Sequence, residues 1–310
     1  MQQSIAKLFS IVAPESATLD VREVDPAVPA AAYPPVNPHY VFESTLLKKM
    51  LFLLVMDGPR KNVFLMGDTG VGKSSLVEQI CARVGIPVFQ VACSGKLRLA
   101  HLVGSYSLKE GNTVWQDGPL TRAMRHGGVF LADEITRMDH SEQMALAHVL
   151  DSGSITVPET GEIVVAAPGF RFVATGNSGG YGDDSGAYNG ERVASVAFLD
   201  RFQKLAVDYL PPEREARLLE SLAPELGDAL IKRMTEFAAK IRSQFVSRGG
   251  ALRVALSTRS MVVWALETSR YGSAHLCENP DVEALNDTVL NGAPADDAKS
   301  ILEVWSNWTE

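Results

Sequence analysis

Residues 62–74 read NVFLMGDTGVGKS, and this stretch decides the fold class. A short apolar run of strand length ends at Met66, and the glycine-rich loop Gly67–Ser74 follows it. The loop fits GxxxxGK[ST], and the next residues (SSLVEQICARV) suit a helix, which is the context that a phosphate-binding Walker A loop requires. Its glycines permit backbone geometries that turn N–H groups toward phosphate oxygens, and a helix N-terminus adds partial positive charge. The stretch therefore predicts a nucleotide-binding strand–loop–helix unit.

The loop also predicts its own cofactors. Lys73 brings a full positive charge to the phosphates, and Ser74 brings a hydroxyl ligand for Mg²⁺. We expect ATP and Mg²⁺ to be the cofactors. The nucleotide-contacting residues are then Gly67, Asp68, Thr69, Gly70, Val71, Gly72, Lys73 and Ser74.

A second apolar run, GGVFLADE at residues 127–134, ends in two carboxylates. This is the Walker B pattern, in which Asp133 holds Mg²⁺ through a water and Glu134 orients and deprotonates the attacking water. A helix cap is the alternative interpretation, because acidic residues often begin helices. The upstream loop favours the catalytic interpretation, and the lack of an NKxD sequence favours ATP over GTP.

Three more polar residues are candidates for the same reaction. Asn177 follows the fourth apolar run, where an amide would lie beside the γ-phosphate as sensor 1; a plain turn residue is the alternative. Arg201 would enter the ATP site of a neighbouring subunit as a trans cation; an ion pair with Asp200 or a nearby acid is the alternative. Arg259 opens a later helix and would reach the phosphates as sensor 2, unless it is a surface residue. The interpretation of Arg201 requires an oligomer.

The wider pattern predicts an α/β fold. Continuous apolar runs that alternate with helices indicate a mostly parallel sheet buried on both faces. The expected strands are 62–66, 88–92, 128–132, 170–174 and 205–207, and the expected helices are 44–56 (with Ser44 as N-cap), 74–84, 120–126 and 140–150. Hairpins are expected within 102–115 and 154–167.

The chain divides into three parts by composition. Residues 1–38 form a Pro- and Ala-rich N-terminal extension, 39–210 the α/β nucleotide-binding domain, and 211–310 an α-helical lid domain. The lid helices are expected at 213–222, 226–246, 258–270 and 295–305.

Bulk composition limits the classes of function. The 310 residues are 46% hydrophobic and 21% charged, typical of a globular protein. A net charge of −8 argues against a broad nucleic-acid surface. The three cysteines lack disulfide or metal spacing, no secretory signal features occur, and the longest apolar run, 50–56, is too short to span a membrane. These features predict a soluble, cytoplasmic protein.

In this order, the motifs resemble the MoxR branch of AAA+ ATPases over roughly residues 37–305. The segment 115–123 (WQDGPLTRA) is similar to the CbbQ/NorQ/NirQ group. The segments 37–42 (NPHYVF), 176–190 (GNSGGYGDDSGAYNG) and 256–265 (LSTRSMVVWA) are similar to CobS, the ATPase subunit of aerobic cobaltochelatase. One departure is Thr69, which stands where CobS has a histidine.

The resemblance implies a five-stranded AAA+ sheet of order 5-1-4-3-2 and a helical lid. It further implies a ring, expected to be hexameric, whose pore is lined by the two hairpins. Such ATPases remodel, activate or insert metal into a client, together with a partner that carries a von Willebrand factor A (VWA) domain. An MCM-like nucleic-acid motor and a nucleotide-gated scaffold are the alternatives; the acidic charge argues against the first and Glu134 against the second.

Some features keep two interpretations. Tyr40 and Phe42 could flank adenine or simply pack in the core. Asp183 and Asp184 lie in a glycine-rich loop and are read as solvated rather than as metal ligands. The six histidines have no ligand spacing.

Overall fold

A five-stranded parallel sheet forms the centre of the computed structural model, which describes residues 2–14, 16–56, 62–182, 188, 190–245 and 249–308. Its spatial order is β11-β3-β10-β7-β4. This order confirms the expected 5-1-4-3-2 arrangement. The strands are β3 (Asn62–Met66), β4 (Val88–Ala92), β7 (Val129–Asp133), β10 (Arg171–Gly176) and β11 (Gln203–Ala206).

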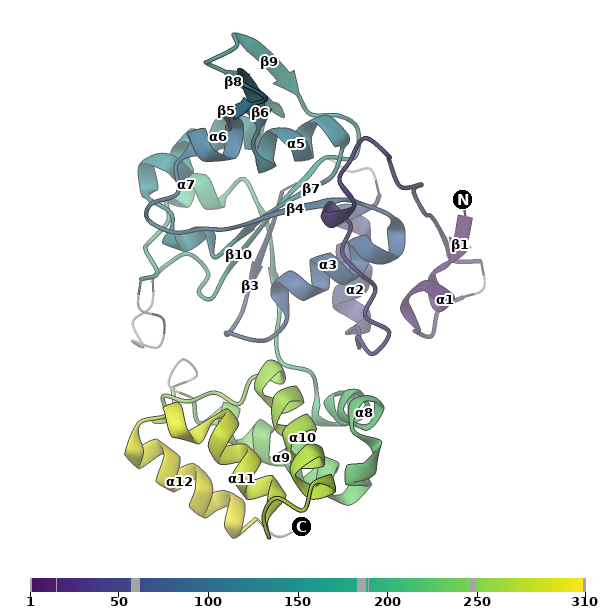
Figure 1. Cartoon of the computed structure of the whole chain (residues 1–310), viewed down its shortest axis with the longest axis vertical. Helices are drawn as coiled ribbons and strands as arrows, with labels where there is room; N and C mark the ends of the chain where they lie inside the picture. The colour runs from purple at the N-terminus through teal and green to yellow at the C-terminus, as the bar shows by residue number, and fades with distance from the viewer. Residues whose placement is uncertain are drawn as a thin grey trace.

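Helices lie on both faces of the sheet (Figure 1). Alternate residues of the strands are buried against one layer of helices or the other. In β3, Val63 and Leu65 contact the layer of α2 (Ser44–Leu54) and α3 (Lys73–Val84), whereas Phe64 faces α5 (Pro119–His126) and α6 (His140–Ser152). Because each strand is covered on both faces, continuous apolar runs are what the sequence needs here. A hydrophobic cluster on each face therefore holds the sheet in place. The carboxyl ends of its strands lie at the site described below.

The N-cap of helix α2 lies one residue earlier than the sequence suggests. The expected N-cap was Ser44, but Glu43 caps the helix, and its carboxylate accepts the N–H groups of Thr45 and Leu46. At the other end of α2, the buried guanidinium of Arg171 donates to the carbonyls of Leu53 and Met56, each at 2.9 Å. A carboxylate at the start and a cation at the end both suit the helix dipole.

Both expected hairpins are present, at the top of Figure 1. The first is β5 (Gly104–Lys109) with β6 (Asn112–Asp117), which follows the short helix α4 (Leu99–Val103). The second is β8 (Ser154–Val157) with β9 (Glu162–Val165). The hydroxyl of Tyr106 donates to the carbonyl of Glu159 at 3.2 Å and so joins the two hairpins.

Residues before α2 contain elements that the sequence did not predict. Strands β1 (Gln2–Ser4) and β2 (Thr18–Asp20) pair antiparallel, with α1 (Ile5–Phe9) between them. Phe9 and Leu19 are buried in the same cluster as α2 and α3. These two side chains therefore anchor the N-terminal segment to the layer formed by α2 and α3.

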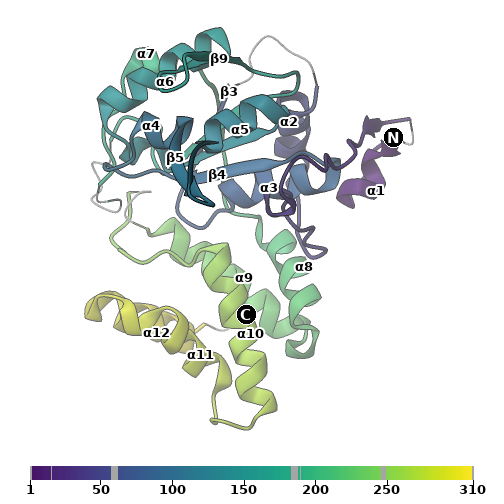
Figure 2. The same cartoon turned by 45° about the horizontal axis from the view of Figure 1, so that its top comes forward.

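The strands end at β11, and helices follow, below the sheet in Figures 1 and 2. Trp264, Trp305 and Phe237 form the centre of their core. Helix α11 was not predicted, and α9 ends earlier than expected, while Val246 lies outside the described residues. The helices are α8 (Pro212–Leu222), α9 (Asp228–Ser243), α10 (Thr258–Ser273), α11 (Pro280–Thr288) and α12 (Ala295–Ser306).

Across the part of the chain that the structure describes, none of the helices has the length and apolar character needed to cross a membrane.

Candidate nucleotide-binding site

The loop Gly67–Ser74 takes a conformation that depends on its glycines. Gly70 has a φ of 70°, and a Cβ there would lie 2.4 Å from the Cβ of Ser257, the N-cap of α10. Gly72 has a φ of 91° and immediately precedes α3. These angles are costly for residues with a side chain. The loop is therefore wrapped around the N-terminus of α3 and packed against the start of α10.

Lys73 is buried under the loop and faces three oxygen acceptors. Its ammonium donates to the carbonyls of Gly67 (2.7 Å) and Asp68 (2.9 Å) and to Oδ1 of Asn177 (2.9 Å). Burial lowers the pKa of Lys73, and the carboxylate of Asp133 opposes this shift. All three acceptors are neutral groups, so an anionic phosphate would compete with them favourably for the ammonium.

Ser74 and Asp133 converge as expected for a metal site. The Ser74 hydroxyl donates to Oδ1 of Asp133 at 2.8 Å, and Thr175 donates to the same oxygen. Within the described residues, no group of three or more His, Cys, Asp or Glu side chains is placed to hold a metal. One hydroxyl and one carboxylate fit Mg²⁺, which keeps several waters and takes further ligands from phosphates.

Glu134 has an unusual backbone for a residue with a long side chain. Its φ is 56°, in the left-handed region, and its N–H donates to the Thr175 hydroxyl at 2.9 Å. Its carboxylate lies 2.7 Å from Nε of Arg137, in the 3-10 turn Ile135–Arg137. Such backbone strain clusters at functional sites, where the surroundings impose it. Thr175 and Arg137 are contacts of the Walker B residues that the sequence analysis missed.

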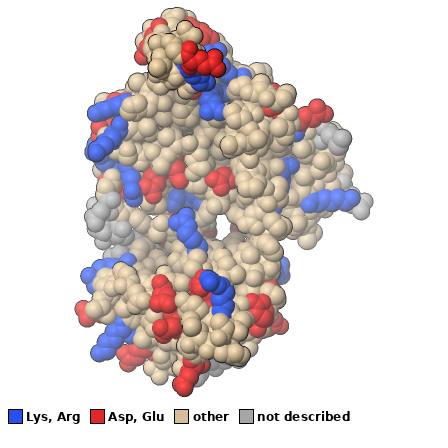
Figure 3. Space-filling model, viewed as in Figure 1, with Lys and Arg blue, Asp and Glu red and all other residues tan. Residues whose placement is uncertain are grey.

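A cavity of about 500 Å³ adjoins the loop, between the sheet and the lower helices. Tyr40, Gly72 and Arg259 are among its lining residues. Figure 3 shows the molecule hollowed between its upper and lower parts. Burial raises the pKa of the Tyr40 hydroxyl. Of the two residues that could flank adenine, Tyr40 lines this cavity. Phe42 instead packs against Phe9 in the core.

A chain of contacts connects the loop to the start of α10. The Tyr209 hydroxyl donates to the carbonyl of Thr69 at 3.0 Å, and the guanidinium of Arg242 lies 4.3 Å from the Tyr209 ring centre. Arg242 makes two 2.8 Å hydrogen bonds to the buried carboxylate of Glu215, which also accepts the Thr258 hydroxyl. Thr258 directly precedes Arg259, so these contacts fix the position of the Arg259 backbone.

Arg201 lies apart from these residues. Its side chain pairs with Asp151 at 2.8 Å, which is the surface ion pair weighed as the alternative, though with Asp151 rather than Asp200. Its carbonyl accepts Nδ2 of Asn62, at the beginning of β3, whereas the phosphate loop follows the end of that strand. The strand separates the two by about 15 Å. Arg201 and Asn62 line a second cavity of about 700 Å³.

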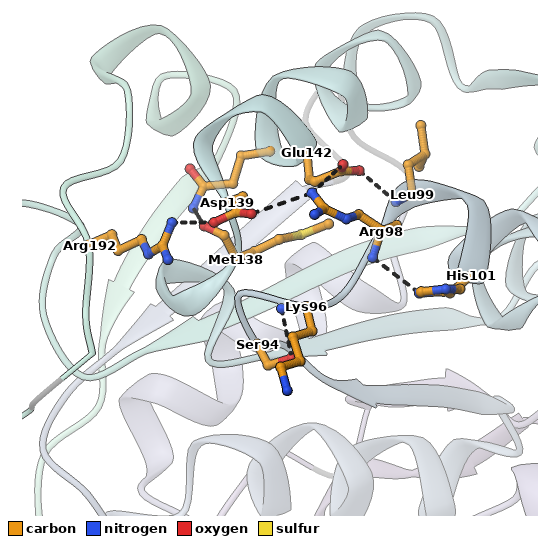
Figure 4. A network of polar contacts seen from close by, with 10 residues as sticks. Ser94, Lys96, Arg98, Leu99, His101, Met138, Asp139, Glu142 and Arg192 are labelled. Atoms are coloured by element: carbon orange, nitrogen blue, oxygen red, sulfur yellow. Dashed lines mark hydrogen bonds and ion pairs between the residues drawn. The ribbon is translucent and has the colours of Figure 1, made fainter.

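A surface network lies beside the Walker B segment (Figure 4). Arg98, in the loop after β4, pairs with Asp139 at 3.4 Å and Glu142 at 3.2 Å, both at the start of α6. Arg192 also pairs with Asp139. The network therefore joins three loops at the edge of the sheet where Asp133 and Asn177 lie.

Comparison with known proteins agrees with this geometry. The model of the AAA domain of the dynein-related subfamily matches residues 62–202. Protein NorQ of Paracoccus denitrificans is 36% identical over 68% of this chain and 74% of its own. Aerobic cobaltochelatase subunit CobS of Sinorhizobium sp. is 28% identical over 82% and 81%. The denitrification regulatory protein NirQ of Pseudomonas aeruginosa is 32% identical over 63% and 81%.

A solved structure of a RuvB mutant from Thermotoga maritima superposes with a TM-score of 0.51, covering 90% of this chain and 82% of the other at 15% identity. That likeness supports the fold alone. The P-loop geometry, the sheet order and the sequence relatives lead to one assignment: the chain is a P-loop ATPase that belongs to the MoxR-type AAA+ family.

Proposed function

We propose that this ATPase binds Mg-ATP between the loop Gly67–Ser74 and helix α10, and that it hydrolyses the γ-phosphate bond. The observation that carries the proposal is the convergence of five side chains from three segments: the start of α3, the end of β7 and the residue after β10. Lys73 contacts Asn177, Ser74 contacts Asp133, and Glu134 adjoins Asp133 at the end of β7. A catalytic ATP site needs a phosphate-binding cation, metal ligands and a base within reach of one another.

Each residue then has a distinct role. The N–H groups of the loop and Lys73 bind the phosphates, while Ser74 and Asp133 hold Mg²⁺, which neutralises charge on the phosphate oxygens when it is bound. Glu134 takes the proton of the attacking water, and Asn177 orients that water. Arg259 lines the adjoining cavity and approaches the phosphates from the helical lid, residues 211–310.

Residues 39–210 form the nucleotide-binding domain, to which the extension 1–38 is added.

Arg201 acts in the site of a neighbouring subunit. Its position beside Asn62, at the beginning of β3, supports action in trans, because its own phosphate loop follows the other end of that strand. A guanidinium supplied by a neighbour stabilises charge that develops in the transition state. The assembly that this requires is a homo-oligomeric ring, for which the family favours a hexamer.

The ring uses ATP turnover to remodel, activate or insert metal into a protein client, together with a VWA-domain partner. The support is the family and its relatives, among them a cobaltochelatase subunit and a denitrification regulatory protein. The two hairpins, which Tyr106 joins at the top of the molecule, would contact the client.

Substitution of the base tests the enzymatic part. Glu134→Gln should lower kcat at least a hundredfold, because the amide cannot accept the proton of the water, while ATP affinity and assembly persist. Measurements are phosphate release, binding of a fluorescent ATP analogue and size-exclusion chromatography. The matched control is Glu220→Gln on the exposed face of α8, which should keep wild-type turnover.

The partner is tested separately. A VWA-domain protein encoded beside this chain should co-purify with the Glu134→Gln form in ATP more than in ADP. Turnover that DNA stimulates, without any binding to a VWA protein, would instead favour the nucleic-acid motor.

A further inference from the structure

We propose that Glu191 is a positioning residue of the ATPase, which holds Asn177 in the orientation that hydrolysis requires. The inference rests on the proposed role of Asn177 as the residue that orients the attacking water. Glu191 lies outside the Walker motifs and comes from the segment before helix α7 (Val196–Leu199). It acts through Asn177 and not on the substrate directly.

The carboxylate of Glu191 makes two hydrogen bonds to consecutive backbone groups. One oxygen accepts the N–H of Asn177 at 2.8 Å, and the other accepts the N–H of Ser178 at 3.1 Å. Hydrogen bonds to an ionised acceptor are about twice as strong as neutral ones. Both oxygens are used, so the pair fixes the direction of the backbone as well as its distance.

These bonds begin where the sheet stops supporting the chain. Strand β10 pairs with β3 as far as Gly176, which is opposite Met66. Asn177 is the next residue, and its N–H finds an acceptor in Glu191 instead of in a neighbouring strand. The Asn177 side chain is held from the other side by Lys73, at 2.9 Å. Asn177 thus has two supports among the described residues: Lys73 holds its side chain, and Glu191 accepts its backbone N–H.

Glu191 is itself anchored to the Walker B side of the site. The N–H of the next residue, Arg192, donates to the carbonyl of Thr136 at 3.1 Å, two residues after Glu134. The Arg192 guanidinium pairs with Asp139 (Figure 4). The segment Glu191–Arg192 thus contacts both the turn after Glu134 and the backbone of Asn177. It therefore fixes the distance between Glu134 and Asn177, which must act on the same water.

A general structural role predicts different kinetics from a positioning role. Glu191 also contributes a negative charge that favours the charged form of Lys73 and so acts to raise its pKa. Removing that charge should not weaken the binding of anionic ATP. Positioning therefore predicts lower kcat with ATP affinity retained or increased, whereas partial unfolding would lower both.

The test compares Glu191→Gln and Glu191→Asp with the wild-type chain in its assembled form. The glutamine amide would place an NH₂ group against a backbone N–H, so kcat should fall about tenfold to a hundredfold, while KM for ATP and analogue affinity stay within about twofold or tighten. Aspartate keeps the charge with a shorter reach and should recover part of kcat. Glu220→Gln again serves as the surface control.

A double-mutant cycle decides whether Glu191 works through Asn177. The single variant Asn177→Ala should already have a lowered kcat. Adding Glu191→Gln to it should lower kcat by no more than about twofold further, because the side chain to be positioned is already gone. Losses that multiply in the double variant would overturn the proposal. So would wild-type kcat in the Gln variant. Failure of the proposed function itself would be seen differently, as turnover that survives Glu134→Gln.

Discussion

Lys73 illustrates how burial shapes the chemistry of one side chain. Desolvation lowers its pKa, and the nearby carboxylates of Asp133 and Glu134 act in the other direction. An arriving phosphate adds negative charge at the ammonium and favours its protonated form. Nucleotide binding and the charge of Lys73 are therefore coupled, and the loop keeps the ammonium in place through neutral carbonyls meanwhile.

The cysteines give a prediction about single residues. Burial raises the pKa of both Cys81 and Cys93 to about 12, and for Cys93 the carboxylates of Asp133 and Glu134 add to the shift. The thiolate is the reactive form, so an alkylating reagent at pH 8 should modify half-buried Cys277 first. Mass spectrometry should find Cys81 and Cys93 modified only in denaturant. Equal rates at all three positions in the folded chain would contradict the described packing.

At the scale of elements, the N-terminus of α10 is tied to two other helices. Glu215 of α8 and Arg242 of α9 form a buried pair, and Thr258 of α10 donates to the same carboxylate. Arg242 also stacks on Tyr209, which contacts the carbonyl of Thr69 in the phosphate loop. Helices α8, α9 and α10 are thereby connected to the phosphate loop through the buried Glu215–Arg242 pair and, nearer the surface, through Tyr209.

Breaking this pair should be costly. Glu215→Ala leaves the Arg242 guanidinium buried without its partner, which should lower the free energy of unfolding by about 3–5 kcal/mol. Chemical denaturation with circular dichroism would measure the loss. Glu213→Ala, on the exposed side of the same helix, is the matched control and should change it by less than about 0.5 kcal/mol. A similar small change at Glu215 would contradict the structure of this region.

The elements that could be predicted from the sequence are those with a local signal. The loop Gly67–Ser74 and the run that ends at Asp133 carry their context with them, and the alternation of apolar runs and helices predicted the sheet. The strands β1 and β2 have only three residues each, too few for a period to be recognised. Helix α11 spans nine residues and mixes polar with apolar positions, so its pattern was weak.

The contacts that complete the site had no local signal. Thr175, Glu191 and Tyr209 contact residues of the site from 14 to 140 positions away in the chain. Thr175 is 42 positions from Asp133, Glu191 is 14 from Asn177, and Tyr209 is 140 from Thr69. Only tertiary folding brings them together. A motif predicts which residues carry the chemistry, whereas the residues that orient them are set by packing.

At the scale of the whole molecule, Arg201 and Lys73 lie at opposite ends of β3, so the proposed ATP site takes its arginine from a neighbouring subunit. The phosphate loop follows the end of β3, whereas Arg201 contacts Asn62, the residue with which that strand begins. In a ring of such subunits, each interface would bring one loop and one neighbouring arginine together. The pairing of Arg201 with Asp151 holds the guanidinium at the surface, where a neighbour could meet it.

Mixing two inactive variants tests this composite site most directly. Arg201→Ala lacks the trans cation but keeps its phosphate loop and base, while Glu134→Gln lacks the base but keeps Arg201. Each should hydrolyse ATP poorly alone. After the two are mixed and allowed to exchange subunits, phosphate release should rise well above the sum of the separate rates, because each Arg201→Ala site can then receive an arginine from a Glu134→Gln neighbour. Mixed rings whose rate never exceeds that sum would contradict an ATP site shared between subunits.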